Sequence, residues 1–136
     1  KDYMNTTIKS CRTKGYVNNI FGRRIHFRGI NDKNFSVRSF QERAAINAPI
    51  QGSAADIIRL AMIKLDQLVE NDKKFKAKML LQIHDELIFE CSKKDKDYVQ
   101  KIVKDTMTSV SSSDYHMFSI PLNVSINSGL NWGEAH

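Results

Sequence analysis

Three ionisable residues stand side by side in an otherwise mainly apolar stretch. His84, Asp85 and Glu86 lie in the middle of MLLQIHDELIFEC, residues 79–91. This pattern predicts a hairpin with buried strands and the three residues at its tip, because burying unpaired carboxylates is costly. A carboxylate there would suit Mg²⁺, which takes one or two protein carboxylates and completes its shell with water and phosphate oxygens. A solvated turn is the simpler explanation, and the tripeptide alone favours it.

A second set of polar side chains recurs at helical spacing. Arg43, Asn47 and Gln51 follow one another at intervals of four residues, which places them on one helical face. All three can donate hydrogen bonds, and every base pair presents acceptors at nearly fixed positions in the minor groove. Such a row would test the geometry of a base pair without reading its identity. A polar face without a partner is the alternative, and the spacing alone is weak support for a function.

The positive charge is concentrated in the first third of the chain. The net charge is +6, and residues 1–43 contain ten Lys/Arg against three Asp/Glu, whereas the remaining residues contain eleven against twelve. A basic segment of this kind is typical of proteins that bind a polyanion such as nucleic acid. On charge alone, a soluble basic surface is an equally good interpretation.

Length and composition indicate one domain-sized chain. Its 136 residues, 41% of them hydrophobic, suffice for a core. No apolar run approaches the roughly 20 residues that span a bilayer, and the first residues lack the apolar centre of a signal peptide. We therefore expect no membrane partner and a cytoplasmic location. Cys11 and Cys91 show no motif spacing, so both are expected to be reduced.

Two helices are predicted in the segment that carries the polar row. The first covers residues 36–47 and is expected to stop at Pro49 and Gly52. The second is expected to start at Ser53, with Asp56 completing a capping box. Its apolar stripe would consist of Ala55, Ile58, Ala61, Met62, Leu65 and Leu68.

Shorter elements are predicted on both sides of these helices. Residues 1–13 have the pattern of a helix end, and residues 15–27 that of a hairpin. Ser92 and Asp95 repeat the capping signature before a third helix, and residues 120–129 are predicted to form a final strand. The apolar positions of these two elements are Val99, Ile102, Val103, Met107 and Val110 in the helix, and Leu122, Val124 and Ile126 in the strand.

Two long segments resemble the family A DNA polymerases. The C-terminal end of the bacterial members is similar to two segments of this chain, ERAAINAPIQGSAADIIRLAMIKL at 42–65 and LLQIHDELIFE at 80–90. Two shorter segments fit the same region in the same order, GYVNNIFGRR before them and GLNWGEAH after them. The resemblance covers essentially the whole chain and is weakest at 28–36 and 109–119. It implies an α+β fold, with the end of the fingers at 1–36. The C-terminal part of the palm, an antiparallel sheet with the HDE hairpin packed by helices, would follow at 37–136.

The resemblance also implies a role for each candidate side chain. Asp85 would bind the catalytic metal ions, two Mg²⁺ in the intact enzyme. Glu86 would be an acidic catalytic neighbour, and His84 would contact the primer end. The positions that contact the minor groove of primer–template DNA are matched by Arg43, Asn47 and Gln51.

Other parts of such an enzyme have no counterpart in this sequence. The family carries a first metal-binding aspartate in a motif like DYSQIELR, a fingers helix that binds the deoxynucleoside triphosphate (dNTP), and a thumb. Two-metal chemistry requires ligands for both ions, so one aspartate is insufficient. We therefore expect a fragment of a bacterial, nucleoid-associated replication or repair polymerase. On its own the fragment should be inactive and should self-associate through its uncovered sheet edge.

Two other functions stay open. A non-catalytic DNA-binding module would use the basic segment and the row that begins at Arg43, and its DNA affinity would depend on salt but not on metal. A small metal-dependent nuclease would use the HDE tip, and Mg²⁺-dependent nicking of a plasmid by this chain would reveal it.

Overall fold

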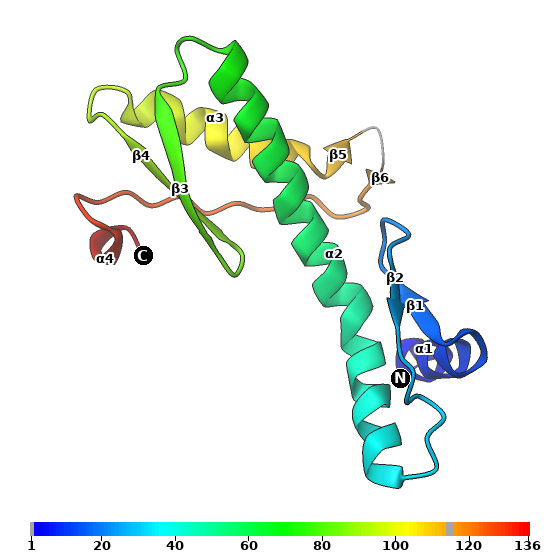
Figure 1. Cartoon of the computed structure of the whole chain (residues 1–136). Helices are drawn as coiled ribbons and strands as arrows, with labels where there is room; N and C mark the ends of the chain where they lie inside the picture. Colours follow the sequence, from blue (N-terminus) through cyan, green and yellow to red (C-terminus); the bar gives the residue numbers. More distant parts are fainter. Residues whose placement is uncertain (1, 114–115) are drawn as a thin grey trace. The chain divides into compact units, whose positions relative to one another are not determined.

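The computed structural model describes residues 2–113 and 116–136, and the chain divides into two compact units, residues 1–56 and 57–136 (Figure 1). Helices combine with small antiparallel sheets, which confirms the predicted α+β class. In the described residues, no helix is both long and apolar enough to cross a membrane. The elements are α1 (Asp2–Lys14), β1 (Tyr16–Asn18), β2 (Arg24–His26), α2 (Phe35–Asn71), β3 (Ala77–Ile83), β4 (Glu86–Cys91), α3 (Lys96–Ser109), β5 (Ser112–Ser113), β6 (His116–Met117) and α4 (Trp132–Ala135).

The first unit contains α1, the β1–β2 hairpin and the beginning of α2. The two strands pair antiparallel, with Val17 opposite Ile25. Gly22 has a φ of 79° and its N–H donates to the carbonyl of Asn19, so a left-handed residue closes the loop. The predicted helix and hairpin are confirmed, although Lys1 lies outside the described residues. The core of this unit consists of Cys11, Val17, Phe27, Ile30 and Ala45.

The predicted break in the second helical segment is wrong. Helix α2 runs without interruption from Phe35 to Asn71 with Pro49 inside it. The hydroxyl of Ser53 donates to the carbonyl of Pro49 at 2.5 Å and does not cap a new helix. Asp56 accepts hydrogen bonds from the β1–β2 hairpin. The two residues that resembled a capping box therefore join the helix to a segment more than thirty positions earlier.

The second unit packs the end of α2 and helix α3 against the β3–β4 hairpin. Its buried core residues are Leu65, Phe75, Ala77, Val99 and Val103. The apolar stripe predicted for α3 is confirmed, and that of α2 is confirmed except for Ala55, which is exposed. Ser92 bonds the side chain of Asp95 at 2.6 Å, and the Asp95 side chain makes no cap hydrogen bond, so the predicted capping box before α3 is wrong.

The β3–β4 strands pair as predicted but are not buried in this chain. Met79 pairs with Phe89, and both side chains pack against the core. A bulge follows Met79, and Leu80 and Leu81 are about half exposed, at 51% and 52%. A hairpin with core on one face alternates in burial, whereas buried strands need cover on both faces.

The predicted final strand does not form. Residues 120–129 form neither a helix nor a strand. The expected alternation is nevertheless present, because Leu122, Val124 and Ile126 are half-buried between exposed neighbours. Ile126 packs against the core of the second unit. The pattern therefore predicted the inward-facing side chains, but not the absence of a paired strand.

Candidate functional site

The HDE residues occupy the tip of the β3–β4 hairpin, as predicted. His84 and Asp85 form the two-residue connection, and Glu86, the first residue of β4, pairs with Ile83. His84 has a φ of 52°, the left-handed conformation that tight hairpin turns require. The side-chain amide of Gln82 donates to the carbonyl of His84 at 2.7 Å and supports this turn. The side chains of all three tip residues are exposed.

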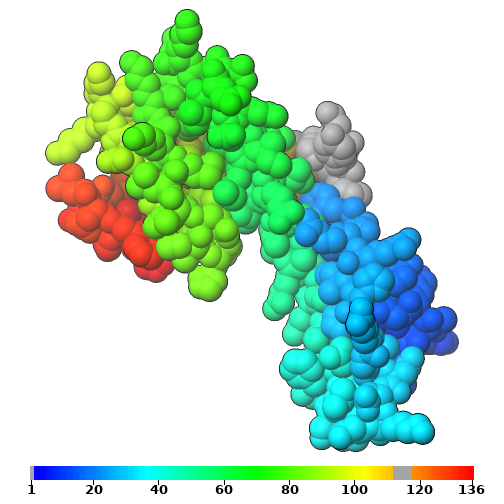
Figure 2. All heavy atoms as spheres, viewed as in Figure 1, coloured from blue at the N-terminus to red at the C-terminus, as the bar shows by residue number. Residues whose placement is uncertain are grey.

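Glu86 and Asp85 differ in their surroundings. The Oε1 atom of Glu86 lies 3.4 Å from Nδ1 of His136, which ends the short helix α4. The indole of Trp132 packs edge-on against the same imidazole. In Figure 2 the red atoms of this C-terminal segment lie beside those of the hairpin. The Asp85 carboxylate makes no hydrogen bond or ion pair with any described residue, so it is free to bind a ligand.

The tip supplies hard oxygen donors for a metal ion. The exposed Asp85 carboxylate, with Glu86 next to it, suits a cation such as Mg²⁺ that keeps several water or phosphate ligands. No group of three or more His, Cys, Asp or Glu residues able to hold a metal ion occurs in the described ranges 2–113 and 116–136. The residues therefore fit as part of a ligand set.

The polar row lies on α2 within the first unit. Arg43, Asn47 and Gln51 are all exposed. Because α2 is continuous, the three positions fall within an arc of roughly 80° and span roughly 12 Å along the axis. Arg43 donates to the hydroxyl of Ser39 at 2.7 Å, while the two amide side chains make no hydrogen bonds to described residues. The structure thus brings the three predicted side chains onto one face.

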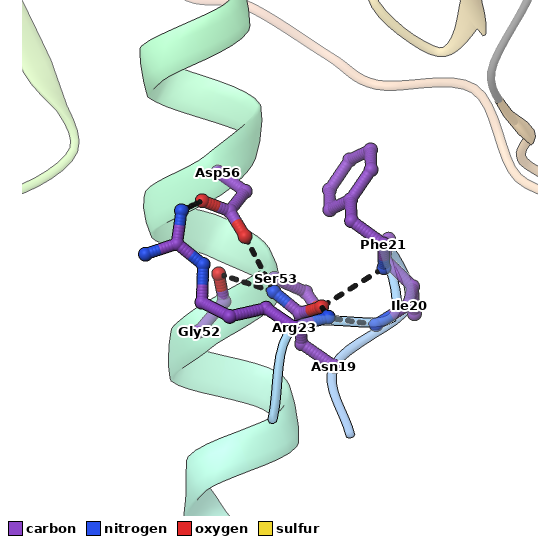
Figure 3. Close-up of polar contacts among 7 residues, drawn as sticks. All are labelled: Asn19, Ile20, Phe21, Arg23, Gly52, Ser53 and Asp56. Atoms are coloured by element: carbon purple, nitrogen blue, oxygen red, sulfur yellow. Dashed lines mark hydrogen bonds and ion pairs between the residues drawn. The ribbon is translucent and has the colours of Figure 1, made fainter. Parts of the chain in front are cut away.

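A buried polar cluster joins α2 to the loop of the β1–β2 hairpin (Figure 3). We name it the Asn19 cluster, and it consists of Asn19, Arg23, Ser53 and Asp56. The side chain of Arg23 is about half exposed and forms an ion pair with Asp56. Asn19, Ser53 and Asp56 are 5%, 8% and 7% exposed. The sequence pattern did not predict this cluster, because the spacing of Ser53 and Asp56 is that of a helix cap.

Asn19 satisfies its whole side-chain amide within this cluster. Its Nδ2 donates to Asp56 Oδ2 at 2.5 Å and to the carbonyl of Gly52 at 3.2 Å. Its Oδ1 accepts from the N–H groups of Phe21 at 3.0 Å and Arg23 at 2.9 Å. Four hydrogen bonds on one buried amide fix both the loop and its distance from the helix.

Comparison with known proteins decides the family of the chain. The model of DNA polymerase family A matches residues 1–134. The chain belongs to this family. It is 48% identical over 137 residues to DNA polymerase I of Rhizobium leguminosarum, a match that covers 100% of this chain and 13% of the relative. DNA polymerase I of Bacillus subtilis is 42% identical over 135 residues, covering 99% of this chain and 15% of the relative.

A solved structure of the family shares the fold. The POL domain of Pol1 from M. smegmatis, in complex with DNA primer–template and dNTP, matches with a TM-score of 0.89 and 39% sequence identity. The match covers 98% of this chain and 23% of that one. The family A membership predicted from the two long segments is therefore confirmed. The chain spans about one seventh of the length of the curated relatives.

Proposed function

We propose that this chain is the C-terminal part of the polymerase domain of a bacterial, cytoplasmic DNA-directed DNA polymerase. The intact enzyme would transfer a nucleotide from a dNTP to the 3′-hydroxyl of a DNA primer, in replication or repair. The observation that carries the proposal is the family match over residues 1–134, which includes both the hairpin tip and the polar row. A similar solved structure holds primer–template DNA and dNTP. In this proposal residues 1–36 end the fingers and residues 37–136 belong to the palm.

The hairpin tip would serve the chemical step. Asp85 would hold Mg²⁺, because its carboxylate is exposed and makes no bond to any residue that the structure describes. When bound, two such ions supply electrostatic stabilisation of the attacking and leaving oxygens. Glu86 would keep the site acidic while its contact with His136 holds it in place, and His84 would meet the primer end. Further ligands would come from other parts of the enzyme.

The polar row would bind the minor groove of primer–template DNA. The amides of Asn47 and Gln51, which have no partner among the described residues, and the guanidinium of Arg43 are donors on one exposed face. The groove presents acceptors at every base pair. The basic character of residues 1–43 adds attraction to the phosphates.

Substitution of Asp85 in the intact polymerase tests the metal role. Asp85→Ala should lower the rate of primer extension by several orders of magnitude with little loss of DNA affinity, because a metal ligand acts on charge in the transition state. The matched control is Glu90→Ala, which removes an exposed carboxylate from the same hairpin and should extend normally. Near-normal turnover of the Asp85 variant would remove the role assigned to it.

A further inference from the structure

The polar row spans the part of α2 whose residues favour a helix least. Pro49 and Gly52 lie within the helix, and Pro49 stands between Asn47 and Gln51. Proline removes a helical hydrogen bond, and glycine is a poor helix former. A kink at such a site would rotate Gln51 away from Arg43 and Asn47.

The Asn19 cluster supports this segment from outside the helix. Asn19 binds the carbonyl of Gly52 and the carboxylate of Asp56, on successive turns. The N–H of Ile20 donates to Ser53 Oγ at 3.2 Å. A Cβ at position 52 would lie 3.1 Å from Ile25 Cδ1, so the missing side chain lets the hairpin pack closely against the helix. These contacts hold the turn that follows Gln51 against the hairpin loop (Figure 3).

We propose that the Asn19 cluster positions Gln51 in register with Arg43 and Asn47, so that the row meets the minor groove as a unit. Asn19 and Asp56 are buried, so they would not contact DNA themselves. They act as positioning residues, through the side chains of the row. This inference rests on the proposed function. It assigns to the β1–β2 hairpin, which is distant in sequence, the task of keeping a DNA-contacting helix continuous past Pro49.

A double-mutant cycle in the intact polymerase tests the inference through kcat/KM for primer extension. Asp56→Asn removes the negative charge of the carboxylate to which both Asn19 and Arg23 donate. It should lower kcat/KM roughly tenfold, because a misplacement of about 1 Å can cost as much as 10²-fold. In the Gln51→Ala background the same substitution should cost less than about twofold, since the group it positions is already missing. If Asp56→Asn acted only by lowering stability, it would reduce kcat/KM by the same factor with and without the Gln51 side chain.

The control is Asp66→Asn, the same change at an exposed position of α2, which should leave kcat/KM unchanged. Thermal melts establish that each variant is folded at the assay temperature. If Asp56→Asn does not fold, Arg23→Gln takes its place, because it breaks the ion pair of a half-exposed side chain. Arg23→Gln should give a smaller loss that again disappears in the Gln51→Ala background.

Three results would overturn the inference. The first is equal fold-losses with and without the Gln51 side chain. The second is unchanged kcat/KM in the folded cluster variant. The third is normal extension by Gln51→Ala, which would also remove the proposed DNA contact. Extension by the parent enzyme, and its loss in Asp85→Ala, report separately on the proposed polymerase function.

Discussion

Polar side chains in this chain fall into two groups with different consequences for mutation. Asn19 and Asp56 are buried and fully engaged, so their replacement leaves polar partners without bonds. Asp85, Asn47 and Gln51 are exposed and make no hydrogen bonds to described residues. Changing them should affect ligands and leave stability nearly intact. This separation makes the candidate site testable by substitution.

Gln51→Ala or Arg43→Ala in the intact polymerase should weaken extension from a correctly paired primer terminus. We expect roughly 1–3 kcal/mol for each, because a buried acceptor in the groove is left unpaired. The loss should be similar for all four correct terminal pairs, since they share these acceptors. Steady-state primer extension measures it, with Arg59→Ala, an exposed residue elsewhere on α2, as the control. A strong dependence on which correct pair stands at the terminus would contradict the role.

At the scale of elements, α2 forms against its local sequence preference. Pro49 leaves the carbonyl of the buried residue Ala45 without its helical partner. The helix continues because the hairpin contacts the following turn at Gly52, Ser53 and Asp56. Tertiary contacts therefore offset a local cost of about 3 kcal/mol.

Pro49→Ala should stabilise this chain. The new N–H can donate to the carbonyl of Ala45, which stabilises the folded state. This gain should exceed the entropic cost of a more flexible unfolded chain, so the free energy of unfolding should rise by roughly 1–2 kcal/mol. Urea denaturation measures the change in the free energy of unfolding. Ala54→Pro, at an exposed position of the same helix, is the reverse control and should destabilise. A less stable Pro49→Ala variant would mean that the proline ring contributes packing that outweighs the missing bond.

A second contact joins elements of the second unit and predicts a dependence on pH. The hydroxyl of Tyr98 on α3 donates to Asp72, just after α2, at 2.7 Å. This hydrogen bond is the main cause that lowers the pKa of Asp72 and raises the pKa of Tyr98. Because the pKa of Asp72 is lower in the folded state, the contact stabilises the folded chain at pH values above the ordinary pKa of aspartate. This stability is lost as the pH falls through the folded-state pKa. For Tyr98 the stability is present below its ordinary pKa and is lost as the pH rises through the raised one.

Tyr98→Phe should therefore destabilise the chain at neutral pH, and the difference from the parent should shrink as the pH falls from 7 toward about 3. Urea denaturation across this range measures it. The control is Tyr3→Phe, which removes a hydroxyl that donates to the backbone carbonyl of Ile46. Because a carbonyl does not titrate, this difference should not vary over the same interval. A Tyr98→Phe difference that stays constant with pH would show that the hydroxyl contributes through packing alone.

At the scale of the whole molecule, apolar surface is left uncovered. The β3–β4 pair forms a two-stranded sheet, so each of its strands has an unpaired edge in the described part of the chain. Large apolar side chains are exposed on both units, including Leu80 at 51%, Leu81 at 52% and Phe35 at 71%. Open edges and apolar patches promote association with another chain, at roughly 25 cal/mol per Å² of apolar surface removed from water.

The isolated chain should consequently self-associate at tens of micromolar. Sedimentation equilibrium measures this, and Leu80→Lys should weaken association by placing a charge beside the open strand edge. Val69→Lys, at a 41% exposed position of α2, is the matched control and should have a smaller effect. A 15.6 kDa monomer at all concentrations and salt levels would contradict the expectation.

Features that depend on neighbouring residues were predictable from the amino-acid order. The hairpin with His84 and Asp85 at its turn, the apolar stripe of α3 and the alternation at Leu122 to Ile126 all follow from local periodicity. The family was recognisable for a related reason, since two long segments preserve residue types in a fixed order.

Features that depend on distant partners emerged only from the folded chain. Ser53 and Asp56 have the spacing of a helix cap, and Pro49 has the chemistry of a helix stop, yet all three lie inside one helix. Each local preference is worth about 1–3 kcal/mol. The buried bonds that Asn19 and Arg23 bring from more than thirty residues earlier outweigh them. Hydrogen bonds between distant residues leave no periodic trace in a sequence, so tertiary contacts determine the continuity of α2 and, with it, the alignment of Gln51.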